Sequence, residues 1–266
     1  MKRFFETLQN IWKIEELKQR ILTTLGLILI YRLGSYVVLP GIDTEVLAAA
    51  NANSNDGGIV ALINAFAGGA FSRASIFGLG IMPYITASII IQLLGMAVPY
   101  FQKMQKEGES GRKKINQYTR FLTVAVTAVQ APGYLAAQVY SKPGVVAIDH
   151  AWFGIQSTII LVAGTMFIMW LGERITDKGI GNGISILIMI GIISRLPFAI
   201  TSEFGARLQS AGGGLIVFLL EIVAILLIII SCILLVQGTR RVPVQYAKKI
   251  VGNFSDWEFF TGESMN

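Results

Sequence analysis

The chain has 266 residues, of which 53% are hydrophobic and only 14% are charged, and its mean hydropathy is +0.62. A soluble globular chain averages about 25% charged residues. This chain therefore has too few charges to coat a water-facing surface, and a soluble enzyme, a disordered segment and a collagen-like rod are excluded. Because most of the chain must face lipid, the net charge of +6 matters mainly through the loops that carry it.

Six apolar runs predict transmembrane helices, since a spanning helix needs about 20 mainly apolar residues. The runs are Ile21–Leu39, Ile76–Tyr100, Phe121–Ser141, Ala151–Gly172, Gly179–Ile200 and Leu208–Thr239. The only Asp, Glu, Lys or Arg residues inside them are Arg32, Arg195 and Glu221. We therefore predict an all-α membrane protein with six transmembrane helices. An intramembrane charge is a functional hypothesis by default, and the role of Glu221 stays open.

A long segment, residues 40–75, separates the first two runs. Its apolar stretch Ile59–Ala67 is too short to span a membrane. Such a segment is tolerated at membrane depth only where it is buried in protein or lines a water-filled cavity. We expect a short re-entrant helix at about residues 57–73 on the outer side; an ordered helix in an outer loop is the alternative.

The basic residues are distributed unequally between the two sets of loops. Residues 1–20, 101–120, 173–183 and 238–253 hold 17 Lys and Arg, whereas the opposite loops hold four. Because Lys and Arg are retained in the cytoplasm, both termini are predicted to be cytoplasmic. The expected organisation is an amphipathic segment at 1–20, five helices within 21–200, a sixth helix within 201–239, and a basic loop with an acidic tail at 240–266.

Nucleotide, metal and disulfide chemistry find no support in the sequence. The chain has one Cys and one His, and Cys232 lies inside an apolar run. Gly179-Ile-Gly-Asn-Gly183 has no βαβ pattern around it, and the Gly spacing near Gly108 does not fit a phosphate-binding loop. We expect no cofactor and no enzymatic activity, and interpret Gly179–Gly183 as a tight turn that opens the fifth helix.

Four long motifs occur in the order found in one membrane-protein family. They are Phe71-Ser-Arg-Ala-Ser-Ile-Phe-Gly-Leu-Gly-Ile-Met-Pro-Tyr84, Lys106-Glu-Gly-Glu-Ser-Gly-Arg-Lys-Lys114, Ile175-Thr-Asp-Lys-Gly-Ile-Gly-Asn-Gly-Ile-Ser185 and Arg240-Arg-Val-Pro-Val-Gln-Tyr-Ala-Lys-Lys249. Over roughly residues 1–252 the chain resembles the SecY family, the pore subunit of the protein-conducting channel. Members have ten spanning helices in two inverted halves, so six helices correspond to the N-terminal half and the sixth helix.

The resemblance implies roles for four groups of residues. It places the constriction ring of the pore at Ile81, Ile85, Ile184 and Ile188, and the plug of the closed pore at Phe66, Gly68, Gly69 and Arg73. It places one side of the lateral gate at Thr86, Ser88, Gln92 and Gln130. It also places docking on the ribosome or SecA at Arg240, Arg241, Lys248 and Lys249. On spacing alone the isoleucines are more typical of packing or lipid-facing positions, the gate residues of bonds between helices, and the basic residues of a membrane anchor.

The implied function is passage of unfolded secretory proteins across the bacterial cytoplasmic (inner) membrane and release of membrane segments through the gate. The implied partners are the SecE and SecG subunits, the SecA motor or the ribosome with its RNA, membrane lipid and the precursor polypeptide. A small-solute secondary transporter is the alternative, but it predicts paired charges near the midplane, which helices two to five lack. Beyond about Gly252 the sequence is expected to depart from the family.

Overall fold

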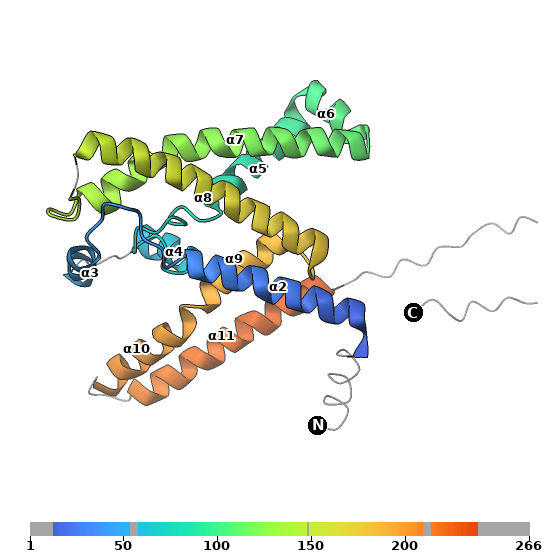
Figure 1. Cartoon of the computed structure of the whole chain (residues 1–266). Coiled ribbons are helices and arrows are strands. Elements are labelled where there is room, and N and C mark those ends of the chain that lie inside the picture. The colour runs from blue at the N-terminus through green and yellow to red at the C-terminus, as the bar shows by residue number, and fades with distance from the viewer. Residues whose placement is uncertain (1–12, 54–57, 148, 210–213, 239–266) are drawn as a thin grey trace, which may run out of the picture. The chain divides into compact units, whose positions relative to one another are not determined.

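The computed structural model describes residues 13–53, 58–147, 149–209 and 214–238, and this part of the chain is helical (Figure 1). The helices are α2 (Glu15–Gly34), α3 (Thr44–Asn53), α4 (Ile59–Phe66), α5 (Met82–Ala97), α6 (Pro99–Lys106), α7 (Glu109–Leu135) with a terminal π-helical turn (Ala136–Tyr140), α8 (His150–Lys178), α9 (Gly183–Ile193), α10 (Leu196–Gln209) and α11 (Gly214–Gln237). Within the described residues the only β pairing is two isolated bridges, Val38 with Ser75 and Ile42 with Val146. The chain divides into two compact units, residues 1–202 and 203–266.

Among the described residues, four helical stretches are long and apolar enough to cross a membrane: 109–140, 150–178, 183–208 and 214–237. The bent pair α5 and α6 makes a fifth if it is one span. Helix α2 does not qualify because it ends at Gly34, and even its most apolar 18 residues contain Lys18, Arg20 and Arg32. The all-α membrane fold is confirmed, whereas six complete spans remain a prediction.

The second predicted run is not one continuous helix. Residues 76–81 form turns, α5 begins only at Met82, and α5 and α6 meet at an angle of 99°. The break falls at Val98, which has an extended backbone and precedes Pro99. A residue before proline is disfavoured in the α conformation, so the proline explains why the helix ends at this point rather than at Tyr100.

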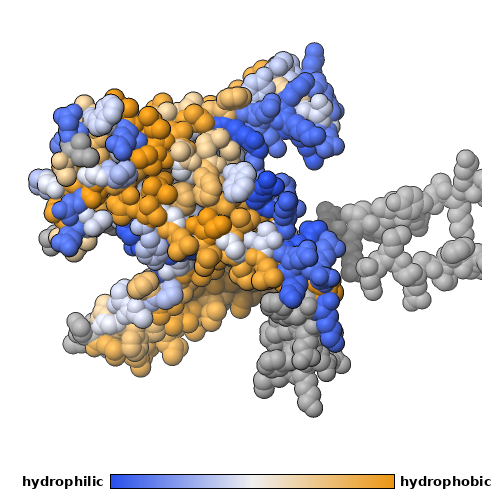
Figure 2. All heavy atoms as spheres, in the orientation of Figure 1, coloured by the Kyte–Doolittle hydropathy of each residue, from blue (hydrophilic) through white to orange (hydrophobic). Residues whose placement is uncertain are grey.

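In the first unit, α7 and α8 pack against each other, α5 packs on α7, and α2 and α9 pack on α8. Three threonines on one face of α7 (Thr119, Thr123 and Thr127) are buried, and each hydroxyl donates to the carbonyl four residues earlier. Their polar groups are therefore satisfied within α7, which lets this face pack closely. Figure 2 shows an apolar surface over the middle of the unit and hydrophilic residues over α6 and the start of α7.

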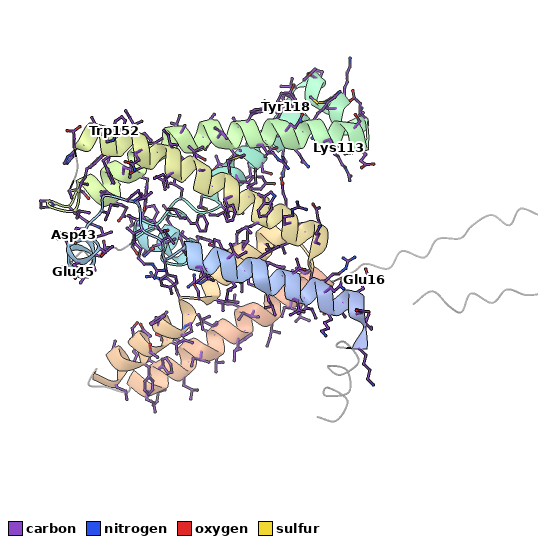
Figure 3. The ribbon with its side chains drawn as sticks, in the orientation of Figure 1. Glu16, Asp43, Glu45, Lys113, Tyr118 and Trp152 are labelled. Carbon is purple, nitrogen blue, oxygen red and sulfur yellow. The ribbon has the colours of Figure 1, made fainter. Side chains whose placement is uncertain are left out.

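Charged residues lie at both ends of this unit (Figure 3), with Glu16 and Lys113 at one end and Asp43 and Glu45 at the other. At the first end, Arg120 of α7 forms an ion pair with Glu173 of α8 at 2.6 Å. At the second end, Asp149 caps α8 by accepting from the Trp152 amide. Of the basic segments predicted to share one side, the described residues 13–20, 101–120 and 173–178 lie toward this first end of the unit (Figure 1).

In the second unit, Glu221 of α11 forms an ion pair with Arg207 at 2.5 Å, and Arg207 also pairs with Glu203 at 2.8 Å. The glutamate left open by the sequence therefore has a specific cationic partner, as an intramembrane carboxylate requires. Phe204 and Phe218 pack edge to face beside it, with ring centroids 5.3 Å apart. The remaining face of α11 is exposed and almost wholly aliphatic.

Candidate functional site: an isoleucine cavity beneath a short helix

Three of the four predicted ring isoleucines line one cavity of about 190 Å³. Ile81 and Ile85 come from the start of α5, and Ile188 comes from α9. Phe66 and Ala67, at the end of α4, line the same cavity. The start of α5 and the middle of α9 are thus brought together around an apolar space that the end of the predicted plug helix also lines.

Ile184, the fourth predicted ring residue, does not line this cavity. It lies one helical turn before Ile188 and packs against α8, where a Cβ atom on Gly172 would stand 3.1 Å from its Cγ1. It belongs to the same apolar cluster as Ile81 and Ile188. In this conformation it supports the cavity wall rather than facing the space.

The predicted Gly-rich turn sets the position of α9. The Asn182 side chain caps the helix, its Oδ1 accepting from the amides of Ile184 at 3.1 Å and Ser185 at 3.3 Å. A Cβ atom on Gly183 would stand 2.0 Å from the Gly172 carbonyl oxygen, so only glycine permits this approach to α8. The interpretation of this segment as a helix-opening turn is confirmed, and the turn orients Ile188 toward the cavity.

The short helix α4 contacts α9 through backbone as well as side chains. A Cβ atom on Gly191 would stand 2.6 Å from the Phe66 carbonyl oxygen, so the two backbones are in direct contact. Ala67, Gly68 and Gly69 are buried, whereas Phe66 keeps 37% of its surface exposed. Small residues therefore allow α4 to pack closely on α9, and Phe66 only partly fills the space beside the cavity.

A few polar contacts hold the segment that follows α4. The buried Asn64 side chain accepts from the Ser72 amide at 3.2 Å, and the Asn51 amide group donates to the Ser72 carbonyl at 2.7 Å. The Tyr134 hydroxyl of α7 donates to the Phe71 carbonyl at 2.8 Å. These contacts anchor the C-terminal side of the short helix, while its N-terminal side follows a segment outside the described residues.

Two arginines meet at the glycine turn. The Gly68 carbonyl accepts from Arg73 Nη2 at 3.0 Å and from Arg32 Nη1 at 3.5 Å. Gly68 and Gly69 have φ of +61° and +85°, a region that side chains rarely adopt. Arg32, an intramembrane charge in the sequence, thus contacts the predicted plug.

The predicted gate residues lie on α5 and α7, which pack against each other. Thr86 donates to the Met82 carbonyl at 3.1 Å, and Gln92 donates to the Ser88 hydroxyl at 3.4 Å, both within α5. The Gln130 side chain on α7 is exposed. The hydrogen bonds of Thr86 and Gln92 therefore stay within α5 and do not join it to a neighbouring helix. Thr86, Gln92 and Gln130 present their polar groups on exposed surface.

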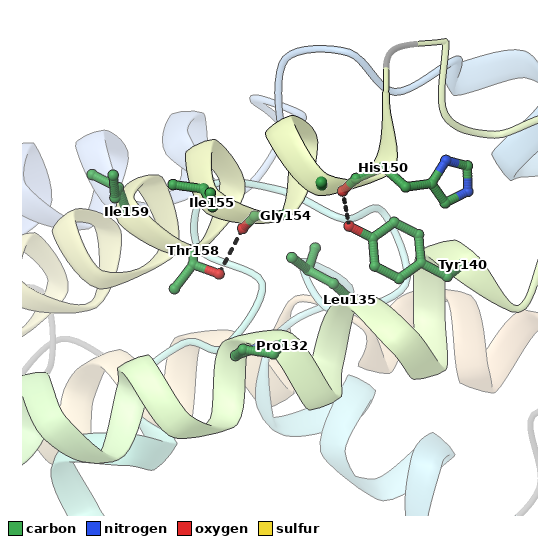
Figure 4. A pocket seen from close by; sticks show the side chains of 9 residues that line it. Pro132, Leu135, Tyr140, His150, Gly154, Ile155, Thr158 and Ile159 are labelled. Atoms are coloured by element: carbon green, nitrogen blue, oxygen red, sulfur yellow. Dashed lines mark hydrogen bonds between the residues drawn. The ribbon is translucent and has the colours of Figure 1, made fainter.

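The predicted docking residues Arg240, Arg241, Lys248 and Lys249 lie outside the described residues. A second pocket, of about 410 Å³, lies between α7 and α8 beside the only histidine (Figure 4). Its lining is apolar, and the Tyr140 hydroxyl donates to the His150 carbonyl at 3.0 Å. No cluster of three His, Cys, Asp or Glu able to hold a metal occurs in the described part of the chain.

The SecY family model matches residues 75–261, which include Ile81, Ile85 and Ile188 of the cavity and the Gly-rich turn. The chain belongs to the SecY family. The family match runs past Gly252, so the expected end of the resemblance was placed too early.

Curated SecY relatives carry the name "Protein translocase subunit SecY". That of Vibrio cholerae is 46% identical over 241 residues, covering 90% of this chain and 53% of the relative. Those of Halalkalibacterium halodurans and Escherichia coli K12 are 42% and 45% identical, covering 58% and 54% of their lengths. The chain therefore spans about half the length of the curated SecY proteins it matches.

Two solved structures share the SecY fold with this chain. One, described as "The structure of a protein conducting channel", has a TM-score of 0.53 and 18% identity, and the match covers 73% of this chain and 42% of that one. The other, Sec61 in a canine ribosome–channel complex from the endoplasmic reticulum, has a TM-score of 0.53 and 19% identity, covering 86% and 50%. At these identities the likeness concerns the fold alone.

Sequence reasoning missed several residues at this cavity. Tyr31 of α2, Ile168 of α8 and Leu187 of α9 also line the isoleucine cavity. No motif marks them, because their role follows from how α2, α8 and α9 pack. Arg195, a charge within the fifth apolar run, was given no role from sequence, and it approaches the Gly69 turn, where a Cβ atom would stand 3.1 Å from its Nε.

Proposed function

We propose that the chain forms one wall of a protein-conducting channel through which unfolded polypeptides cross a membrane. The observation that carries the proposal is that Phe66 and Ala67 share one cavity with Ile81, Ile85 and Ile188. A short helix seated on a ring of apolar side chains has the arrangement needed for a closed pore. The printed name of the curated relatives, protein translocase subunit, supports the same function.

The proposed mechanism is passive. Branched apolar side chains make no directional bonds to a passing chain, and when the pore is empty they close and exclude water. The short helix blocks the ring in the closed state and leaves when a polypeptide enters. Its seat depends on small residues and a few hydrogen bonds, which suits an element with a low cost of local displacement.

We further propose that α5 and α7 form one side of the lateral gate, with Thr86, Ser88, Gln92 and Gln130 on it. The basic segment Arg240–Lys249 serves for docking on a ribosome or the SecA motor, because basic side chains gain from counterion release on contacting RNA phosphates. SecE and SecG are the proposed subunit partners. The proposed location is the bacterial inner membrane, with residues 1–20 and 240–266 on the cytoplasmic side.

Reconstitution into vesicles tests the function. Vesicles that hold this chain as part of a complete channel should move a secretory precursor into a protease-protected state when SecA and ATP, or translating ribosomes, are supplied. Vesicles without the chain are the control. Substrate-driven uptake of a small solute without any precursor transport would refute the channel and favour a transporter.

A further inference from the structure

An open pocket of about 960 Å³ in the first unit gathers three arginines, one of them Arg73 of the predicted plug. Arg32 comes from α2, Arg73 follows the glycine turn, and Arg195 lies between α9 and α10. The Tyr36 ring packs beneath two of them, 4.2 Å from the Arg73 guanidinium carbon and 5.6 Å from that of Arg32. Segments far apart in the sequence thus bring three positive charges to one pocket.

The guanidinium groups converge on the glycine turn. A Cβ atom on Gly69 would stand 2.8 Å from Arg73 Nη2 and 3.1 Å from Arg195 Nε, so these two nitrogens lie within about 6 Å of each other. A Cβ atom on the adjacent Gly68 would stand 2.9 Å from Arg32 Nη1. Like charges at such distances repel one another, and an anion placed between them relieves the repulsion.

The pocket supplies no carboxylate to balance these charges. Neither Asp nor Glu is among the residues that line it, and no ion pair involves Arg32, Arg73 or Arg195 in the described part of the chain. Their recorded acceptors are neutral: the Gly68 carbonyl, the Tyr36 hydroxyl and the Tyr36 ring. The Nε atom of Arg73 is buried and has no hydrogen-bond partner.

We infer that this arginine pocket is a binding site for a small oxyanion, a phosphate or carboxylate group. Guanidinium binds both groups through paired hydrogen bonds between opposite charges, a bidentate geometry that a single neutral carbonyl does not offer. A bound oxyanion therefore competes with the Gly68 carbonyl for Arg73 and Arg32. Occupancy of the pocket loosens the turn that holds α4 on α9.

Binding of inorganic phosphate to the purified chain in detergent tests the site without any transport. The thermal midpoint should rise with phosphate concentration at fixed ionic strength, as expected for a ligand of the folded state, and chloride should not reproduce the rise. In the double variant Arg73→Gln/Arg195→Gln the apparent Kd should weaken at least tenfold. The matched control Arg112→Gln, which removes an exposed charge on α7, away from the pocket, should bind as the unaltered chain does.

Hydrogen exchange supplies a second readout. Saturating phosphate should speed exchange of the α4 amides in the unaltered chain and leave the double variant unchanged. Equal phosphate affinity in both proteins, or no phosphate effect on either, would overturn the inference. If the double variant does not fold, Arg195→Lys, which keeps the charge but loses the paired geometry, should bind phosphate more weakly; unaltered affinity would count against the site.

Two further arms identify the source of the group. In nanodiscs of phosphatidylglycerol the lipid headgroup should already occupy the site, so added phosphate should have no effect. In nanodiscs of phosphatidylcholine the effect of added phosphate should persist. Acetate tests the carboxylate group in the same assay. Binding of any of these that depends on Arg73 and Arg195 supports the site, and binding that does not depend on them refutes it.

Discussion

The Phe66 carbonyl oxygen lies against Gly191, only 2.6 Å from the point where a Cβ atom on that glycine would stand. This backbone contact seats the short helix α4 on α9, directly beside the cavity formed by Ile81, Ile85 and Ile188. Closure of the proposed pore should therefore depend on the absence of a side chain at Gly191.

Gly191→Ala should displace α4, because the new methyl group cannot fit against the Phe66 carbonyl and overpacking of this kind costs about 1–3 kcal/mol. Hydrogen exchange of residues 60–67 should quicken, and the ion leak of the complete channel should rise. Gly26→Ala is the control, since nothing lies within 4 Å of its Cβ position on α2. Unaltered exchange in Gly191→Ala would show that the contact does not seat the helix.

Ile85→Gly/Ile188→Gly should raise the ion leak of the complete channel several-fold. Both side chains line the cavity, and their loss removes the apolar surface that keeps an empty pore dry. Single-channel or vesicle-flux recording measures the change. Ile192→Gly, on an exposed face of α9, is the matched control and should leave the leak low. Equal leaks in the two variants would show that Ile85 and Ile188 do not form the seal.

Asn182→Ala should cost about 1 kcal/mol, because the α9 amides of Ile184 and Ser185 lose their cap. The thermal midpoint should fall, and Asn182→Asp should restore it, since aspartate caps equally well. Thermal unfolding in detergent measures both. A fall that aspartate does not restore would contradict capping as the role of the side chain.

The Arg120–Glu173 ion pair should contribute no more than about 1 kcal/mol, because exposed pairs gain little in water. The two side chains keep 48% and 28% of their surface exposed. A double-mutant cycle with Arg120→Gln and Glu173→Gln measures the coupling free energy, which should shrink further in high salt. A coupling that is several times larger and insensitive to salt would indicate a shielded pair.

Arg240→Glu/Arg241→Glu should weaken binding of ribosomes or SecA at least tenfold at physiological salt, because two attractive charges become repulsive. Cosedimentation with channel-containing vesicles measures the affinity. Arg112→Glu/Lys113→Glu reverses two charges in the first turns of α7 and should have a smaller effect. Unaltered binding in the first variant would leave that segment only the role of a membrane anchor.

Much of the fold follows from local sequence. Apolar runs predicted where α7, α8, α9 and α11 would form, and Asn182 before an apolar run predicted the start of α9. Helix ends were less predictable. Helix α7 begins at Glu109 rather than Phe121, because the polar residues that precede the apolar run are also helical. The break at Val98 was missed, although Pro99 signals it.

The sequence by itself determined that this protein is an all-helical membrane chain with SecY-type motifs, because composition, run length and turn chemistry act over neighbouring residues. Only the tertiary structure decided that Ile188 faces the cavity while Ile184 packs on Gly172, and that Arg195 meets Arg73 beside Gly69. These contacts depend on how closely the backbones of neighbouring segments approach each other at Gly172, Gly183 and Gly191. That approach is set by packing between segments distant in the chain, which no local pattern specifies.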